Sequence, residues 1–184
     1  LVGVLRKKIE ALPFGKDINL IVTSDHGMTD ISPERVVNIN DYVKPEWCEV
    51  IDGRTPTSIF SKPEYRDSIC NALKKAAHIH VWKKEEIPAE LHYGSSDRIG
   101  DIVVAPELGW QFTDVARDTK GAHGYFPQSP DMQVMFRAIG PDFKRGYISG
   151  GFVNVDIYPL LSHLLQIVPE KTDGQFKRIK EILR

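Results

Sequence analysis

The chain of 184 residues is 41% hydrophobic and carries 24 basic and 25 acidic side chains, a composition typical of a folded domain with a sizeable core. Because these charges nearly cancel, a nucleic-acid duplex would find no general attraction to the protein, and any phosphate recognition must be local. The longest apolar runs are far shorter than the roughly 20 residues that cross a bilayer, so no transmembrane segment is predicted in this chain.

The start of the chain predicts a helix followed by a strand. Apolar residues recur there at helical spacing: Val2, Leu5, Ile9 and Leu12. The short β-branched run from Ile18 to Thr23 is typical of a buried parallel strand, and it ends abruptly at the polar segment from Ser24 to Gly27. Open α/β sheets place their ligands at the carboxyl ends of such strands.

The central part predicts a small β-α-β unit beside the main sheet, and we expect it to be an insertion of about residues 50–100. Strands are expected at residues 57–60, 79–83 and 101–105, and a helix with proline in its first turn at residues 63–77. A long loop at residues 109–131 follows, and loops of that length in compact domains are usually functional or mobile.

The remainder predicts a strand at residues 133–139, an amphipathic helix at 155–167 and a short final helix at about 174–183. Strands that alternate with helices favour an α/β sandwich around a mainly parallel sheet. The sequence opens at Leu1 without an initiator methionine, so we expect the natural start to lie upstream.

Asp25 and His26 form the first candidate site. A carboxylate next to an imidazole offers oxygen and nitrogen donors that suit zinc, and Gly27 lets the backbone pass close to an ion. An equally simple interpretation is that Asp25 caps the next turn, with His26 exposed beside it. His123 lies in the long loop between Gly121 and Gly124, where close approach to a bound group is possible, although a solvent-exposed histidine would look the same.

Other histidines and the cysteines are not assigned to chemistry. His78 and His80 alternate at the start of a strand and would share one face, but surface histidines are the simpler interpretation. His163 is expected to pack or to lie at an interface on the helix near the end of the chain. Cys48 and Cys70 are expected to be free thiols, since their spacing suits neither zinc nor redox work.

Several blocks of this sequence resemble one known family. They are residues 21–28 (IVTSDHGM), residues 121–125 (GAHGY) with 131–133 and 140–144 beyond, and residues 153–161 with 172–174 beyond. Together they are similar to the metal-ligand motifs and the closing helix of the nucleotide pyrophosphatases/phosphodiesterases in the alkaline-phosphatase superfamily. The blocks follow the family order and span most of the chain.

The resemblance implies an alkaline-phosphatase-like α/β fold, with residues 1–184 as the C-terminal part of the catalytic domain. It implies that Asp25 and His26 bind one zinc ion and His123 the other, in a two-zinc site that works through a phospho-threonine intermediate. The threonine nucleophile and the remaining ligands would precede residue 1, so no catalytic nucleophile is expected here. With three ligands for two ions, zinc occupancy and activity of this chain alone are expected to be poor.

The resemblance also implies partners and a location. The expected partners are a nucleotide or other phosphodiester small molecule and the missing N-terminal half of the same domain. An extracytoplasmic location, secreted or periplasmic, is typical of the family. The strand at residues 18–22 would lose neighbours if that half were absent, so self-association through exposed sheet surface is a further expectation.

Three functions remain open from the sequence. The intact protein could hydrolyse nucleotide phosphodiester or pyrophosphate bonds and release 5′-nucleotides. It could instead hydrolyse a choline phosphodiester of the lysophospholipid or sphingomyelin type. The chain could also be a non-catalytic fragment or module that only folds or binds.

Overall fold

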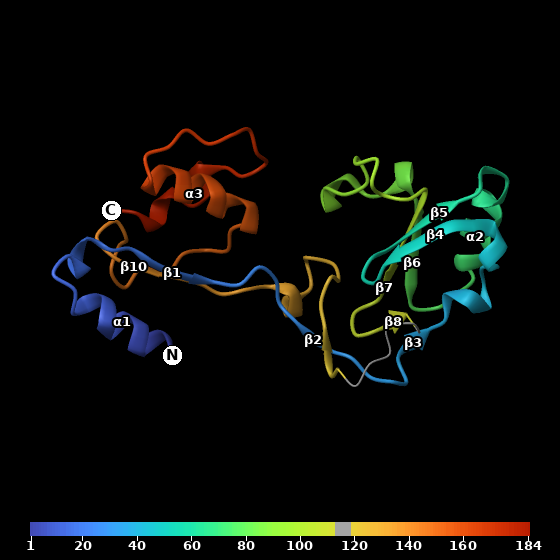
Figure 1. Ribbon diagram of the computed structural model, residues 1–184, viewed down its shortest axis with the longest axis horizontal. Helices are drawn as coiled ribbons and strands as arrows, with labels where there is room; N and C mark the ends of the chain where they lie inside the picture. The colour runs from blue at the N-terminus through green and yellow to red at the C-terminus, as the bar shows by residue number, and fades with distance from the viewer. Residues whose placement is uncertain (113–118) are drawn as a thin grey trace. The chain divides into compact units, whose positions relative to one another are not determined.

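The computed structural model describes residues 1–112 and 119–184, and it divides into two compact units (Figure 1). Unit 1 comprises Leu1–Asp25 and Val134–Arg184, and unit 2 comprises His26–Gln133. The predicted loop at residues 109–131 includes residues 113–118, which lie outside the described residues. The described residues contain both helices and strands, but these do not alternate as the sequence predicts, because one α-helix separates two runs of strands.

Unit 1 contains two helices, α1 (Val2–Glu10) and α3 (Ile157–Leu164), and the strand pair β1 (Leu20–Thr23) and β10 (Phe136–Ile139). The expectation of a buried parallel strand at residues 18–23 is wrong. β1 pairs antiparallel with β10, and its side chains are half-buried or exposed. A short apolar run has a β preference but carries no information on strand direction, which the partner strand decides.

The core of unit 1 joins α3 to the end of the chain. Its buried side chains are Phe143, Leu160, Ile179 and Ile182. The predicted final helix at residues 174–183 is wrong, because two short 3₁₀ turns, Phe176–Arg178 and Lys180–Ile182, occupy this stretch. The last residues bond to another segment instead of continuing a helix, since the Lys144 N–H donates to the Ile182 carbonyl and the Arg184 N–H to that of Asp142.

Asp156 ties these terminal turns to the start of α3. Its side chain is fully buried, and it accepts hydrogen bonds from the Gln175 N–H at 2.7 Å and from the Arg178 Nη2 at 2.6 Å. Burial by itself would raise the pKa of the Asp156 carboxyl, but the bonds from Arg178 and Gln175 outweigh it and hold that pKa below its ordinary value. The carboxylate is therefore the stable form at neutral pH.

Unit 2 is built around a four-stranded antiparallel sheet in the order β4-β5-β7-β6. The strands are β4 (Cys48–Gly53), β5 (Thr57–Ser61), β7 (Ile102–Pro106) and β6 (Ile79–Lys83), and helix α2 (Arg66–Leu73) connects β5 to β6. Because β7 lies between β5 and β6, the predicted β-α-β unit is a split one. Helix α2 and the two central strands contribute fully buried side chains to its core: Ile59, Ile69, Leu73, Ile102 and Val104.

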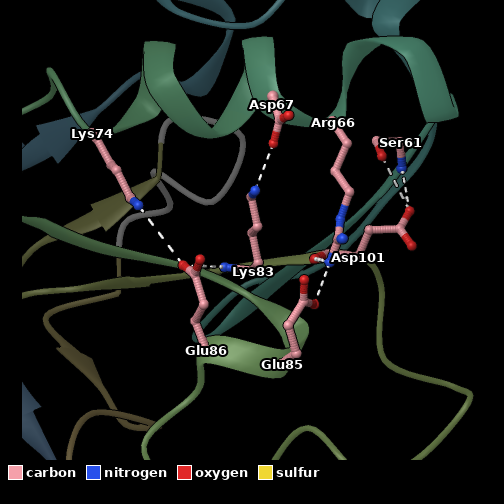
Figure 2. A network of polar contacts seen from close by, with 8 residues as sticks. All are labelled: Ser61, Arg66, Asp67, Lys74, Lys83, Glu85, Glu86 and Asp101. Atoms are coloured by element: carbon pink, nitrogen blue, oxygen red, sulfur yellow. Dashed lines mark hydrogen bonds and ion pairs between the residues drawn. The ribbon is translucent and has the colours of Figure 1, made fainter.

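A polar network holds α2 against β6 and the turn that follows (Figure 2). Its contacts are Arg66 with Glu85, Lys83 with Asp67 at 2.6 Å, Lys74 with Glu86 at 3.8 Å, and the Ser61 N–H with Asp101 at 2.9 Å. The hydrogen bond from Arg66 lowers the pKa of Glu85, and the one from Lys83 lowers that of Asp67. Since most of these groups are exposed to solvent, they add little stability and chiefly favour one register of helix on strand.

The described part of unit 2 also contains four strands of two residues each. β2 (Thr29–Asp30) pairs antiparallel with β9 (Gly121–Ala122), and β3 (Val36–Val37) pairs parallel with β8 (Gln111–Phe112). Sequence periodicity does not predict them, because two residues are too few to show alternation. The predicted helices are also shorter than expected. Helix α2 begins at Arg66 after a 3₁₀ turn at Pro63–Tyr65, and α3 ends at Leu164.

Cys48 is half-buried and Cys70 is buried, and both are free thiols, as the sequence predicts. Among the described residues, no helix has the length and apolar character needed to span a membrane.

Replacing Asp156 with asparagine should lower the free energy of unfolding by about 3 kcal/mol, because the new amide N–H would face the Arg178 guanidinium. Urea unfolding at about pH 7 measures this difference. The matched control is Asp173→Asn, an exposed carboxylate nearby that should change stability by less than about 0.5 kcal/mol.

The same variant tests the lowered pKa of Asp156. A carboxylate with a lowered folded-state pKa contributes stability above its unfolded pKa and loses it as the pH falls through the folded value. The stability gap between the wild type and Asp156→Asn should therefore shrink on acidification toward about pH 3. A constant gap would contradict the assignment.

Candidate functional site

His26 and His123 lie side by side in unit 2. Their ring centroids are 3.6 Å apart and their planes are inclined by 14°. The β2–β9 pair brings them together, since Thr29 lies opposite Ala122 and Asp30 opposite Gly121. His26 precedes β2 and His123 directly follows β9, so antiparallel pairing places both at the same end of the ladder.

Gly27 allows a close backbone approach next to His26. Its N–H donates to the Met132 carbonyl at 3.1 Å. A Cβ atom at this position would lie 1.9 Å from the Asp131 carbonyl oxygen, so no residue with a side chain fits without movement of the backbone. The Thr29 hydroxyl donates a hydrogen bond to the Asp131 carboxylate at 2.6 Å, which is a second contact between these two segments.

Gly124 and Tyr125 hold the backbone after His123. Gly124 has a φ of +94°, and a Cβ there would lie 2.1 Å from the Thr55 carbonyl oxygen. The Tyr125 ring is buried, and its hydroxyl donates to the Trp110 carbonyl at 2.7 Å. Burial raises the pKa of Tyr125, so the phenol keeps the proton that it donates.

The contact of His26 with the Gly27 carbonyl fits one tautomer of the imidazole. Its Nδ1 lies 2.9 Å from the Gly27 carbonyl oxygen, which can only accept, so Nδ1 carries the proton in this contact. The neutral ring then presents the lone pair of Nε2, which is the arrangement commonly found in metal-binding histidines. This donor is of a type that suits zinc.

The two histidines are suitable metal ligands by type, but they are too few to complete a metal site. Across residues 1–112 and 119–184, no three His, Cys, Asp or Glu side chains gather closely enough to hold a metal ion. The His26 and His123 pair therefore fits part of a metal site, and further ligands would be needed to complete it.

Asp25 lies directly after β1, and the boundary between the two units falls between Asp25 and His26. Within unit 1 its backbone carbonyl accepts a hydrogen bond from the Asn154 Nδ2 at 3.0 Å. Its side chain is exposed. The structure thus brings His26 and His123 together, while a shared role for Asp25 stays a prediction.

Comparison with known proteins decides the family. The family described as type I phosphodiesterase / nucleotide pyrophosphatase matches residues 1–126, a range that includes all three candidate residues. The chain belongs to this family. Bovine (Bos taurus) bis(5′-adenosyl)-triphosphatase ENPP4 is 35% identical over 184 residues, which cover 99% of this chain and 40% of that relative.

Solved structures of the phosphodiesterase family agree. Murine ectonucleotide pyrophosphatase/phosphodiesterase 5 matches with a TM-score of 0.92 at 33% identity, over 100% of this chain and 50% of that one. An inactive variant of the same murine protein in complex with AMP matches with a TM-score of 0.91 at 33% identity, over the same shares of the two chains. This likeness confirms the alkaline-phosphatase-like α/β fold. The chain spans about 40% of the length of the curated relatives it matches.

The sequence pattern does not predict which residues support the backbone around His26 and His123. The Trp110 carbonyl accepts a hydrogen bond from the Tyr125 hydroxyl, and no side-chain pattern predicts this contact. Asp131 and Met132 lie in one of the family-like blocks, but only the structure shows their backbone against Gly27.

Substituting Gly27 with alanine should destabilise unit 2 by about 2 kcal/mol, because the new methyl group must displace the Asp131 backbone. Imidazole proton resonances of His26 and His123 should move in the same variant as their stacking is lost. Gly3→Ala is the control, since a Cβ there meets nothing within 4 Å. A Gly27→Ala protein with the stability and histidine spectrum of the wild type would show that the close approach is dispensable.

Proposed function

We propose that this chain forms part of a catalytic domain that hydrolyses nucleotide phosphodiester or pyrophosphate bonds and releases 5′-nucleotides. The observation that carries the proposal is the contact between His26 and His123 inside the segment that matches the phosphodiesterase family. Two imidazoles held side by side at the ends of paired strands form a preorganised donor set.

We further propose that Asp25, His26 and His123 are zinc ligands in the whole protein. Zinc held by these side chains would neutralise charge on the phosphoryl group during transfer. The chain itself would contribute orientation: the Gly27 carbonyl keeps the His26 proton on Nδ1, and the tight backbone contact at Gly27 limits movement of the ring.

The relatives support a nucleotide as the substrate class. One is named as a bis(5′-adenosyl)-triphosphatase, and an inactive variant of another was solved in complex with AMP. The near-zero net charge of this chain fits a small substrate recognised at one local site better than an extended polyanion.

In the whole protein, His123→Ala and Asp25→Asn should each lower kcat/KM for para-nitrophenyl thymidine monophosphate by at least about 100-fold. His92→Ala is the matched control, because His92 is an exposed loop histidine of the same unit and should leave the rate unchanged. A wild-type rate for His123→Ala would contradict the ligand assignment. Higher kcat/KM for para-nitrophenylphosphorylcholine would contradict the substrate class.

The 184-residue polypeptide by itself should hydrolyse nucleotide diesters no faster than background, even with added zinc. A catalytic zinc usually has three protein ligands and an open position, and the described residues hold no cluster of three candidate ligands. A chromogenic diester assay on the purified chain tests this. Activity that disappears with chelator and with His123→Ala would refute the expectation.

A further inference from the structure

An aromatic cluster lies beside the segment that carries His123. Phe126 contacts His80 edge-to-face, with ring centroids 4.9 Å apart and planes at 79°, and contacts Trp82 at 6.1 Å and 89°. His80 and Trp82 stack on each other at 5.6 Å. These three residues, His80, Trp82 and Phe126, are called the β6 clamp below. Edge-to-face geometry is the arrangement that aromatic quadrupoles favour.

The β6 side of the clamp is held firmly by the sheet. His80 and Trp82 are two positions apart on β6 and therefore share one face, while Val81 points to the other and packs against the core of unit 2. The β6–β7 pairing places His80 opposite Ala105 and Trp82 opposite Val103. His80 was expected to be a surface residue, but the structure places it within this cluster, half-buried.

A second anchor lies next to Phe126 in the sequence. The Tyr125 hydroxyl donates to the Trp110 carbonyl, and the Trp110 ring stacks on His78 at 3.7 Å and 9°. The His78 Nδ1 lies 2.9 Å from the Glu107 carboxylate. Tyr125 is thus held by a hydrogen bond to the Trp110 backbone, and the next residue, Phe126, by ring contacts with β6.

These two contacts matter for His123 because Gly124 lies between them and the histidine. Gly124 is the residue between His123 and Tyr125, and glycine leaves more backbone conformations open than any other residue. Without attachment of the residues that follow it, rotation at Gly124 would move His123 relative to His26. The native φ of +94° at Gly124 is therefore maintained from outside, by the Thr55 backbone on one side and the anchored residues on the other.

We propose that the β6 clamp positions the His123 imidazole against His26. In this role His80, Trp82 and Phe126 are positioning residues that act through the backbone of the 123–126 segment. An effect of the clamp on zinc binding rests on the proposed function. The position of the His123 imidazole does not depend on that function.

The test compares Trp82→Ala and Phe126→Ala with the matched control Trp47→Ala in the full 184-residue chain. Trp47 also belongs to unit 2 and stacks on a ring at 5.7 Å and 15°, but its partner is Tyr65. Imidazole proton NMR of His26 and His123 is the first measurement. Both clamp variants should shift these resonances, Trp47→Ala should not, and Trp82→Phe should restore the wild-type positions. Unshifted resonances in both clamp variants would overturn the proposal.

Zinc titration of the same variants, made in the whole protein, separates this proposal from the proposed function. The zinc dissociation constant should rise about 10-fold in Trp82→Ala, as is usual when a residue that orients a metal ligand is lost. A whole protein of wild-type sequence that binds no zinc, while the clamp variants still shift His123, would reject the metal role and support the clamp. Zinc binding by His123 with unchanged affinity and spectra in both clamp variants would reject the clamp alone.

Thermal unfolding of each variant shows whether the protein is still folded, so that a shifted resonance is not mistaken for general unfolding. If Trp82→Ala fails to fold, Phe126→Leu takes its place, because it keeps an apolar side chain of similar size but removes the ring. A shifted His123 resonance in a folded Phe126→Leu protein supports the clamp, and an unshifted one overturns it.

Discussion

The backbone contact between Gly27 and the 131–132 segment determines how the candidate site is built. It leaves no room for a Cβ atom, and together with the β2–β9 pair it carries His26 to the place where His123 follows its own strand. The two histidines are distant in the sequence, so their contact depends on closing a long loop, which costs conformational entropy. The backbone hydrogen bonds of two-residue strands offset only part of this entropy. The side-chain hydrogen bonds of Thr29 and Tyr125 add to the stability of the closed loop.

Burial explains why the charged groups of the two units have different roles. The Asp156 carboxylate in unit 1 is shielded from water, so replacing it would leave the Arg178 guanidinium without its partner. The network around Arg66 and Lys83 in unit 2 has more contacts, but water competes for most of its groups. A single ion pair with a buried carboxylate is therefore more important for stability here than several pairs whose groups are mostly exposed.

The candidate site could be predicted from the sequence only as a set of residue types. Asp25, His26 and His123 were recognisable because carboxylate and imidazole groups beside glycine suit metal binding, and because their blocks resemble a known family. The stacking of His26 on His123 and the contact of the His26 Nδ1 with the Gly27 carbonyl could not be predicted. Neither could the clamp around Phe126, since an edge-to-face contact between a strand and a distant loop leaves no periodic pattern.

The sequence by itself determined the helices and strands that are long enough to show a regular pattern of side chains. These include α1, α3 and the strands β5 and β6, because backbone propensity and the placement of apolar side chains are local properties. Only the tertiary structure decided the antiparallel direction of β1, the two-residue strands and the 3₁₀ turns at the chain end. Each of these depends on a hydrogen-bonding partner far away in the sequence, and a local pattern cannot specify which partner a backbone N–H will find.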